Sequence, residues 1–143
     1  IYSLCETLNF PISALFLEDN SDKIKLVRHN ERVSFVRNTS HEQPIVESLI
    51  TKGNTEMWGG VVDMPPHTDS GDYYYHEGEE FVFILEGHLT FLLEDYPPYV
   101  LEAGDTLYYP NEIGHRWENR SDAPAKFIIV STSVFTTDIG KDI

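Results

Sequence analysis

Residues 71–80 read Gly71-Asp72-Tyr73-Tyr74-Tyr75-His76-Glu77-Gly78-Glu79-Glu80, and six further residues separate Glu80 from Gly87. A second stretch begins at Gly104 and continues after five residues as Pro110-Asn111-Glu112-Ile113-Gly114-His115-Arg116-Trp117-Glu118-Asn119. Both stretches combine glycines, which suit tight turns, with histidine and carboxylate side chains. They therefore indicate chemistry carried on short strands and turns.

Three side chains of these stretches are candidate metal ligands. His76 and Glu80 lie on either side of a turn at Gly78, and His115 begins a predicted strand. Imidazole and carboxylate groups together suit a divalent transition metal, and two histidines with one carboxylate form the open site of non-haem Fe(II) oxygenases. His76, Glu80 and His115 are therefore predicted to hold one divalent ion (Zn, Fe, Ni or Mn).

Short runs rich in Val, Ile, Phe, Tyr and Thr extend outward from the two stretches and are separated by turn residues. The predicted strands cover residues 24–29, 33–37, 45–51, 56–64, 73–76, 80–85, 88–93, 99–101, 106–109, 115–119 and 125–131. A spacing of about 8–12 residues with few helices is typical of an all-β sandwich or barrel. Glu86-Gly87, between two apolar runs, predicts a tight hairpin.

The spacings resemble the two cupin motifs, Gly-x5-His-x-His-x3-Glu-x6-Gly and Gly-x5-Pro-x-Gly-x2-His-x3-Asn, over residues 71–119. The resemblance implies a jelly roll and carries over the three ligands named above. Two positions differ, because Tyr74 replaces the first histidine and Glu112 replaces the glycine of Pro-x-Gly. Since the fourth ligand is lost, a metal-free polar cluster is the alternative to a metal site.

Three aromatic residues are candidate ligand-binding residues, and no residue is assigned a catalytic role. Tyr74 occupies the position of the missing ligand, where it could coordinate as a phenolate, contact a ligand or fill space. Trp117 shares strand parity with His115, which fits either the pocket or the core. Trp58, beside Gly59-Gly60, is a weaker candidate.

Length and charge limit the function. The 143 residues fit one domain, and 10 basic against 24 acidic residues give a net charge of −14, which excludes nucleic-acid binding by this chain alone. Between Lys52 and Arg116 there are 13 carboxylates and no Lys or Arg. A pocket built from that stretch lacks an arginine for phosphate or carboxylate, so an amine-bearing or neutral ligand is expected. The alternative is that basic residues from earlier in the chain fold over the mouth of the pocket: Lys23, Lys25, Arg28, Arg32 and Arg37.

The single cysteine excludes an internal disulfide and a Cys-based zinc site, which fits a reducing, cytoplasmic compartment. No apolar run approaches the ~20 residues that a membrane-spanning helix needs. No membrane association is therefore expected.

The residues around the motifs, from Pro65-Pro66 through His76–Val82 to His115–Asn119, also resemble the C-terminal sensor domain of Xre-like transcriptional regulators. Residues 1–18 resemble the last helices of a helix-turn-helix domain, whose reading helix would precede Ile1. This narrower resemblance implies a helical stub (1–18), a cupin domain (19–143), a small-molecule effector, and DNA binding only through the absent domain. The alternatives are a mononuclear Fe(II) oxygenase, epoxidase or isomerase, and a purely structural cupin.

The run from Phe81 to Leu85 is apolar on both faces. If Glu80, Val82 and Ile84 point inward, then Phe81, Phe83 and Leu85 point outward. Leu89, Phe91 and Leu93 on the following strand are expected to extend the outer patch. A large outer apolar patch predicts a homodimer.

Overall fold

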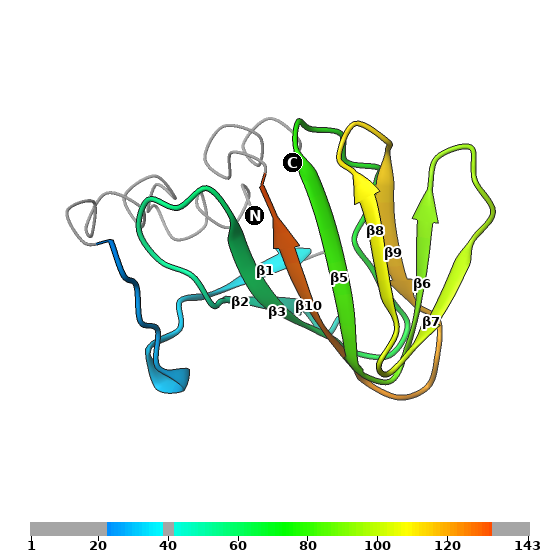
Figure 1. The fold of residues 1–143 in the computed structure, drawn as a ribbon. Helices are drawn as coiled ribbons and strands as arrows, with labels where there is room; N and C mark the ends of the chain where they lie inside the picture. Colours follow the sequence, from blue (N-terminus) through cyan, green and yellow to red (C-terminus); the bar gives the residue numbers. More distant parts are fainter. Residues whose placement is uncertain (1–22, 39–41, 133–143) are drawn as a thin grey trace.

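Two antiparallel sheets form the fold in the computed structural model, which describes residues 23–38 and 42–132. In spatial order, the six-stranded sheet contains β1 (Ser34–Asn38), β2 (Ile45–Leu49), β3 (Trp58–Met64), β10 (Ala125–Ser131), β5 (Glu79–Glu86) and β8 (Thr106–Pro110). The four-stranded sheet contains β4 (Thr68–Asp69), β9 (His115–Asn119), β6 (His88–Leu93) and β7 (Tyr99–Glu102). Figure 1 shows the two sheets facing one another, so the predicted all-β jelly roll is confirmed.

Two predicted strands are wrong and one strand was missed. Residues 24–29 form no strand, and they lead into a short 3-10 helix, η1 (His29–Glu31). Residues 73–76 make only an isolated bridge from Tyr74 to His115, because Gly71 and Gly78 turn the chain with φ angles of 93° and 98°. The missed strand is the two-residue β4, which is too short to leave a pattern. The predicted helical stub lies outside the described residues.

The turn at Glu86-Gly87 is a corner between the sheets and not the predicted hairpin. β5 pairs with β10 and β8, whereas β6 pairs with β9 and β7. Gly87 has a φ angle of +81°, and a Cβ there would lie 2.7 Å from the carbonyl oxygen of Pro124. A glycine is therefore required for the chain to change sheets.

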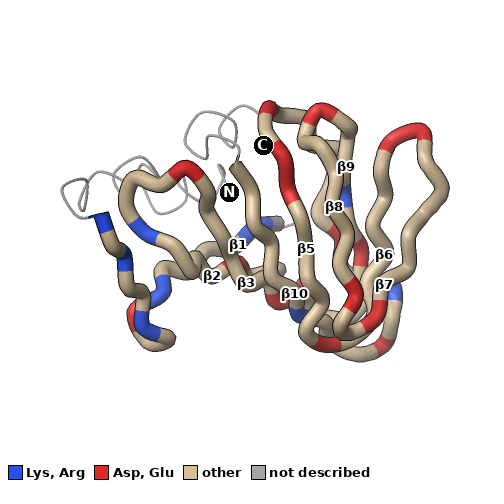
Figure 2. Tube along the Cα trace, viewed as in Figure 1, with Lys and Arg blue, Asp and Glu red and all other residues tan. Residues whose placement is uncertain are grey.

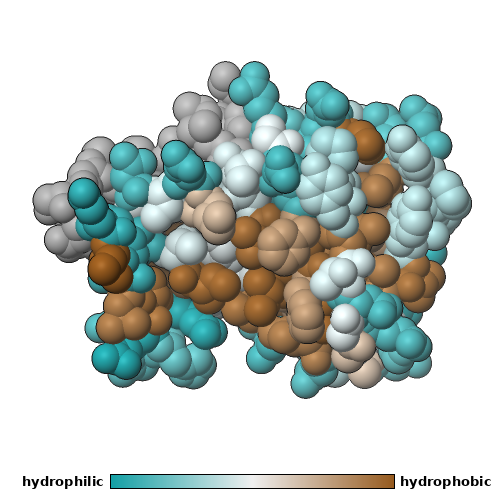
Figure 3. Space-filling model, viewed as in Figure 1, coloured by the Kyte–Doolittle hydropathy of each residue, from teal (hydrophilic) through white to brown (hydrophobic). Residues whose placement is uncertain are grey.

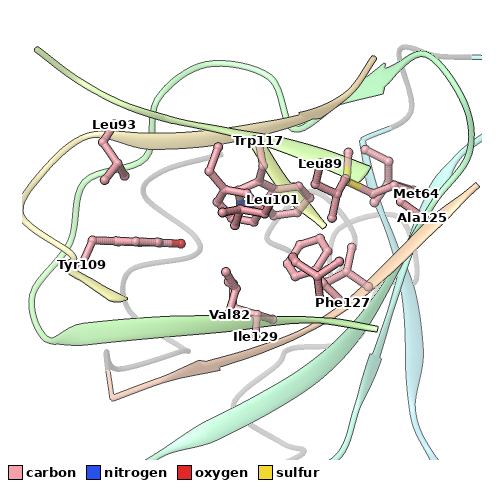
Figure 4. Packing of buried hydrophobic residues seen from close by; sticks show 14 of the residues in the cluster. Met64, Val82, Leu89, Leu93, Leu101, Tyr109, Trp117, Ala125, Phe127 and Ile129 are labelled. Carbon is pink, nitrogen blue, oxygen red and sulfur yellow. The ribbon is translucent and has the colours of Figure 1, made fainter. Parts of the chain in front are cut away.

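This corner also corrects the predicted outer patch. Leu89, Phe91 and Leu93 belong to the buried core, because β6 lies in the opposite sheet and turns these residues inward. Phe91, Trp117 and Phe127 pack edge to face or tilted, with ring centroids 5.0–6.4 Å apart. Figure 4 shows Trp117 and Phe127 within this cluster between the sheets.

The outer face of β5 does expose apolar residues, as expected. Phe81, Phe83 and Leu85 are 38–43% exposed, whereas Glu80, Val82 and Ile84 are buried. Figure 3 shows hydrophobic side chains gathered on this side of the molecule, over the region of β10 and β5. In Figure 2, basic residues concentrate before and within β1, and acidic residues predominate from β5 to β9.

Candidate metal centre

Glu80 comes from the six-stranded sheet, in a row of inward-facing residues that crosses four strands. Strand register pairs Trp58 of β3 with Ser131 of β10, Ser131 with Glu80 of β5, and Glu80 with Tyr109 of β8. All four residues are buried. A carboxylate is thereby fixed on the inner face at one end of the barrel.

The two histidines approach from the opposite side. His115 begins β9 in the four-stranded sheet, and the segment that carries His76 joins this strand through the bridge at Tyr74. The Nε2 atoms of His76 and His115 lie 3.2 Å apart, and Nε2 of His115 lies 3.8 Å from Oε2 of Glu80. One ligand atom from each of the three residues fits within 4.8 Å. The three predicted ligands are thus brought together from the two sheets and from the segment that precedes β5.

The donor atoms fit a divalent transition metal. Nδ1 of His115 lies 2.8 Å from the carbonyl oxygen of Ile113, to which it donates a hydrogen bond, so Nε2 is the unprotonated ring nitrogen when His115 is neutral. Metal–ligand bonds of about 2.0–2.2 Å place neighbouring donors roughly 3–3.5 Å apart at tetrahedral or octahedral angles. The 3.2 Å separation of the two nitrogens falls in this range. A zinc- or iron-type ion would have His76, Glu80 and His115 as protein ligands.

Tyr109 fixes the carboxylate of Glu80. Its hydroxyl donates a hydrogen bond to Oε2 of Glu80, and its ring lies 5.0 Å from that of His115. Figure 4 shows this hydroxyl pointing into the interior. Burial, followed by the charge of Glu80, raises the pKa of Tyr109 well above its ordinary value, so Tyr109 stays a donor at neutral pH. Its role was missed, because only the strand register reveals that Tyr109 faces Glu80.

The electrostatics of Glu80 reflect its burial. Desolvation raises the pKa of its carboxyl above the ordinary value, although the hydrogen bond from Tyr109 and the charges of Arg37 and His76 act in the opposite direction. A nearby cation stabilises the ionised form of a carboxylate that is buried in this way. The three residues could therefore hold a metal ion.

Tyr74 lies beside the centre and its hydroxyl is engaged elsewhere. Its backbone pairs with that of His115, and its hydroxyl donates to the carbonyl oxygen of Ser70 at 2.8 Å. The ring centroid lies 6.3 Å from that of His115. At the position of the ligand that the cupin motif has lost, this chain therefore has the buried aromatic ring of Tyr74.

Trp117 and Trp58 are both buried. Trp117 faces inward with His115, as its strand parity predicts, and packs in the apolar core. Trp58 lies on the row of Glu80, two strands away. Arg116 faces away from the interior, as expected, and donates to the carbonyl oxygen of Gly71. Ligand binding by Tyr74, Trp117 and Trp58 stays a prediction.

Arg37 is a buried residue of the barrel interior. It belongs to β1, outside the acidic stretch, at a bulge between Val36 and Asn38. Its Nη1 donates to Oε1 of the buried Glu47 at 2.6 Å. Its guanidinium carbon lies 5.2 Å from the ring centroid of Tyr74 and 5.0 Å from that of Trp117. The interior therefore contains an arginine that comes from outside the acidic stretch.

The motif asparagine, Asn119, has a structural role. Its side-chain amide donates to the carbonyl oxygens of Met64, Pro65 and Ala123 at 2.9–3.2 Å. These bonds join the end of β9 both to the end of β3 and to the turn that precedes β10.

Among the residues that the structure describes, no helix has the length and apolar character that crossing a membrane requires.

Two facing antiparallel sheets around an internal His-Glu-His cluster define a jelly-roll protein with a metal-type site. The chain belongs to the cupin domain family, which matches residues 60–131, just over half of its length. The predicted cupin resemblance is therefore confirmed. The comparisons with known proteins lend no support to the narrower resemblance to Xre-like regulators.

Two relatives come from Streptomyces. The chain is 31% identical over 78 residues to protein SchB of Streptomyces halstedii, covering 54% of this chain and 56% of SchB. It is 32% identical over 79 residues to polyketide synthase CurC of Streptomyces cyaneus, covering 55% of this chain and 51% of CurC. The chain thus matches only about half the length of either relative.

Solved structures share the fold at low identity. The Fe(II) form of HppE has a TM-score of 0.66 at 20% identity, covering 89% of this chain and 71% of HppE. A cupin superfamily sugar phosphate isomerase from Silicibacter pomeroyi has a TM-score of 0.61 at 21% identity, covering 76% and 75%. These likenesses support the jelly roll alone.

Proposed function

We propose that this chain is a mononuclear, metal-dependent cupin enzyme that acts on a small organic molecule. The observation that carries the proposal is the convergence of His76, Glu80 and His115, whose ligand atoms lie within 4.8 Å of one another. The tautomer of His115 and the orientation of Glu80 are both fixed by hydrogen bonds. The relatives of the chain include a polyketide synthase, which favours a role in biosynthetic chemistry.

The chain's own residues prepare the site for such chemistry. A bound divalent ion polarises a coordinated substrate oxygen as a Lewis acid. Tyr109 and the carbonyl oxygen of Ile113 hold two of the three ligands in place, which lowers the reorganisation needed on binding. Glu80 and His115 are only 3% and 2% exposed, so bulk water is excluded from that side. Three protein ligands leave positions open for a substrate.

The effector-sensing domain of a DNA-binding regulator is the competing function. It rests on the narrower resemblance of the motifs and of residues 1–18, which lie outside the described residues. None of the relatives named above carries the name of a transcriptional regulator. The same barrel would bind a ligand in that case without converting it.

Metal analysis and turnover test the proposal. We expect the purified chain to bind one Zn, Fe, Ni or Mn ion, and to convert a small oxygen-rich substrate in a panel of polyketide-type and hydroxy-acid compounds. Mass spectrometry would detect the product, and a chelator would abolish its formation. Absence of bound metal under all four ions contradicts the proposal. Saturable ligand binding with no product in the panel favours the sensor.

A homodimer is also proposed, because the outer face of β5 exposes Phe81, Phe83 and Leu85. We expect multi-angle light scattering to give twice the monomer mass. Phe83→Lys should return the chain to a monomer, since a charge cannot be buried unpaired at an interface. Tyr96→Lys, at an exposed site between β6 and β7, is the matched control. A monomeric wild-type chain at high concentration contradicts the proposal.

A further inference from the structure

Arg37 is a buried cation with unused hydrogen-bonding capacity. The residue is 8% exposed, and a guanidinium carries five N–H donors. Within the described residues, the guanidinium makes one hydrogen bond, from Nη1 to Glu47. Its buried Nε has no hydrogen-bond partner. Oε2 of Glu47 likewise has no hydrogen-bond partner there. The ion pair therefore leaves donors of Arg37 available to a further group.

The surroundings hold the guanidinium in one place. Arg37 lies at a β-bulge, a feature that redirects a side chain. Its guanidinium carbon lies about equally far from the rings of Tyr74 and Trp117, at 5.2 and 5.0 Å, within the range of cation–π contacts. Tyr74 pairs with His115, and Trp117 follows His115 by two residues on the same inner face. The cation is thus positioned one step along β9 from the metal centre.

Arg37 and the metal centre also share an electrostatic environment. Desolvation lowers the pKa of Arg37, but the interactions of Arg37 with Glu47, Tyr74 and Glu80 more than offset this effect. The charge of Arg37 in turn lowers the pKa of Glu80. The two carboxylates of Glu80 and Glu47 carry two negative charges, whereas a divalent ion and Arg37 together carry three positive charges. The interior is then left with one positive charge when both histidines are neutral.

We propose that Arg37 is a positioning residue that binds a carboxylate or other monoanionic oxygen group of a ligand whose far end reaches the metal centre. This inference rests on the proposed function and deepens it by naming a substrate class. Tyr74 replaces a motif histidine and forms the wall on which Arg37 lies. In this chain, the motif's ligand position therefore carries the ring of Tyr74, which supports the proposed anion-binding cation, Arg37. A monoanionic ligand neutralises the interior, whereas an amine adds charge to it.

A purely structural ion pair is the competing explanation. Such a pair would have its donors and acceptors satisfied, because a buried pair with open hydrogen-bonding sites gains little over apolar packing. Glu47 also faces Gly60, where a Cβ would lie 2.7 Å from Oε2, so its carboxylate is held against the backbone. Glu47 thus orients Arg37 and competes with an incoming anion for it.

Charge variants separate these explanations. NMR titrations of Zn²⁺-loaded protein, with metal content measured first, would use acetate as the anion, acetamide as its neutral analogue and ethylamine as the cation. In the double variant Arg37→Gln/Glu47→Gln, which leaves no unpaired buried charge, acetate binding should weaken by about ten- to hundredfold, while acetamide binding is unchanged. Glu47→Gln alone should tighten acetate binding. Arg116→Gln, at the surface, is the matched control and should change neither.

The proposal is overturned if the double variant binds acetate as tightly as the wild type, if Glu47→Gln weakens acetate binding, or if ethylamine binds more tightly than acetate. A structural role for Arg37 predicts weaker binding in both Glu47 variants. If the wild type takes up no metal, the proposed function fails, and the same titrations on the metal-free chain still decide whether acetate binding depends on Arg37. If Glu47→Gln does not fold, the double variant decides alone.

Discussion

The two ends of the barrel interior are built by the same strands and have opposite chemistry. β5 contributes Glu80 at one end and Ile84 towards the other, and β10 contributes Ser131 and Phe127 in the same way. At the polar end, the inward positions hold ligands, hydrogen bonds and charge. At the apolar end, rings pack at 5.0–6.4 Å. Strand alternation decides which residues face inward, and the residue at each inward step decides whether the interior stabilises the fold or performs chemistry.

Removal of the central ligand should have the largest effect on the polar end. His115→Ala should abolish stoichiometric metal binding, because His115 lies within 3.2 Å of His76 and 3.8 Å of Glu80 and links both to one site. The strand content measured by circular dichroism should be unchanged, since the apolar end is intact. His88→Ala, at an exposed histidine, should keep its metal. Stoichiometric metal that survives in His115→Ala places the site elsewhere.

Truncation at the apolar end should show the reverse pattern. Phe127→Ala should lower the free energy of unfolding by about 3–5 kcal/mol, because it removes a fully buried ring between Phe91 and Trp117. Metal bound per folded chain should stay the same. Phe83→Ala, on the outer face of the neighbouring strand, should cost under about 1 kcal/mol in urea denaturation at low protein concentration. Equal costs would remove the distinction between the two ends.

The sequence predicted the polar end better than its surroundings. His76, Glu80 and His115 were predicted because ligand types and spacing are local features of the chain. Phe91 and its strand neighbours were assigned to the wrong face, because a corner and a hairpin look alike until the pairing of each strand is known.

For a related reason, Tyr109 was not predicted as a site residue, and Arg37 was named only as one of several basic residues that could fold over the pocket. Tyr109 faces Glu80 only through the register of β5 and β8, and Arg37 enters from β1, far along the chain. A charge count over one segment therefore leaves out Arg37, which a strand from another part of the chain brings into the interior. Tyr74 and Trp117 were predicted to face inward from strand parity, and both are buried.

A smaller effect should sharpen the comparison within the polar end. Tyr109→Phe should weaken metal binding by about 10- to 100-fold, because it removes the donor that holds Glu80 in place. The ring still fills its space, so thermal stability of the metal-free chain should change little. Tyr108→Phe, at the neighbouring 59% exposed position, should leave metal affinity unchanged. Competition titrations against a chromophoric chelator would measure both, and equal affinities would show that Tyr109 only packs.

The smallest effect concerns the stability of the metal-free chain. Burial raises the pKa of Glu80 in the folded state, so the folded chain binds this proton more tightly than the unfolded chain. The contribution of Glu80 to stability is therefore fully present below the ordinary carboxyl pKa. It declines as the pH rises from that value through the raised pKa, and an ionised, metal-free Glu80 then weakens the fold. Glu80→Gln should accordingly be more stable than the wild type at pH 7 in chelator, and this advantage should shrink towards pH 4. Chemical denaturation across this pH range measures the difference between the two proteins, which removes the contribution of other titrating groups.

Glu79→Gln, at the adjacent exposed carboxylate, should show no such pH-dependent difference. Added metal should reverse the order, because only the wild type gains binding energy from the ion. A Glu80→Gln chain that is less stable than the wild type at pH 7 without metal would mean that the polar end stabilises the fold even when no ion is bound.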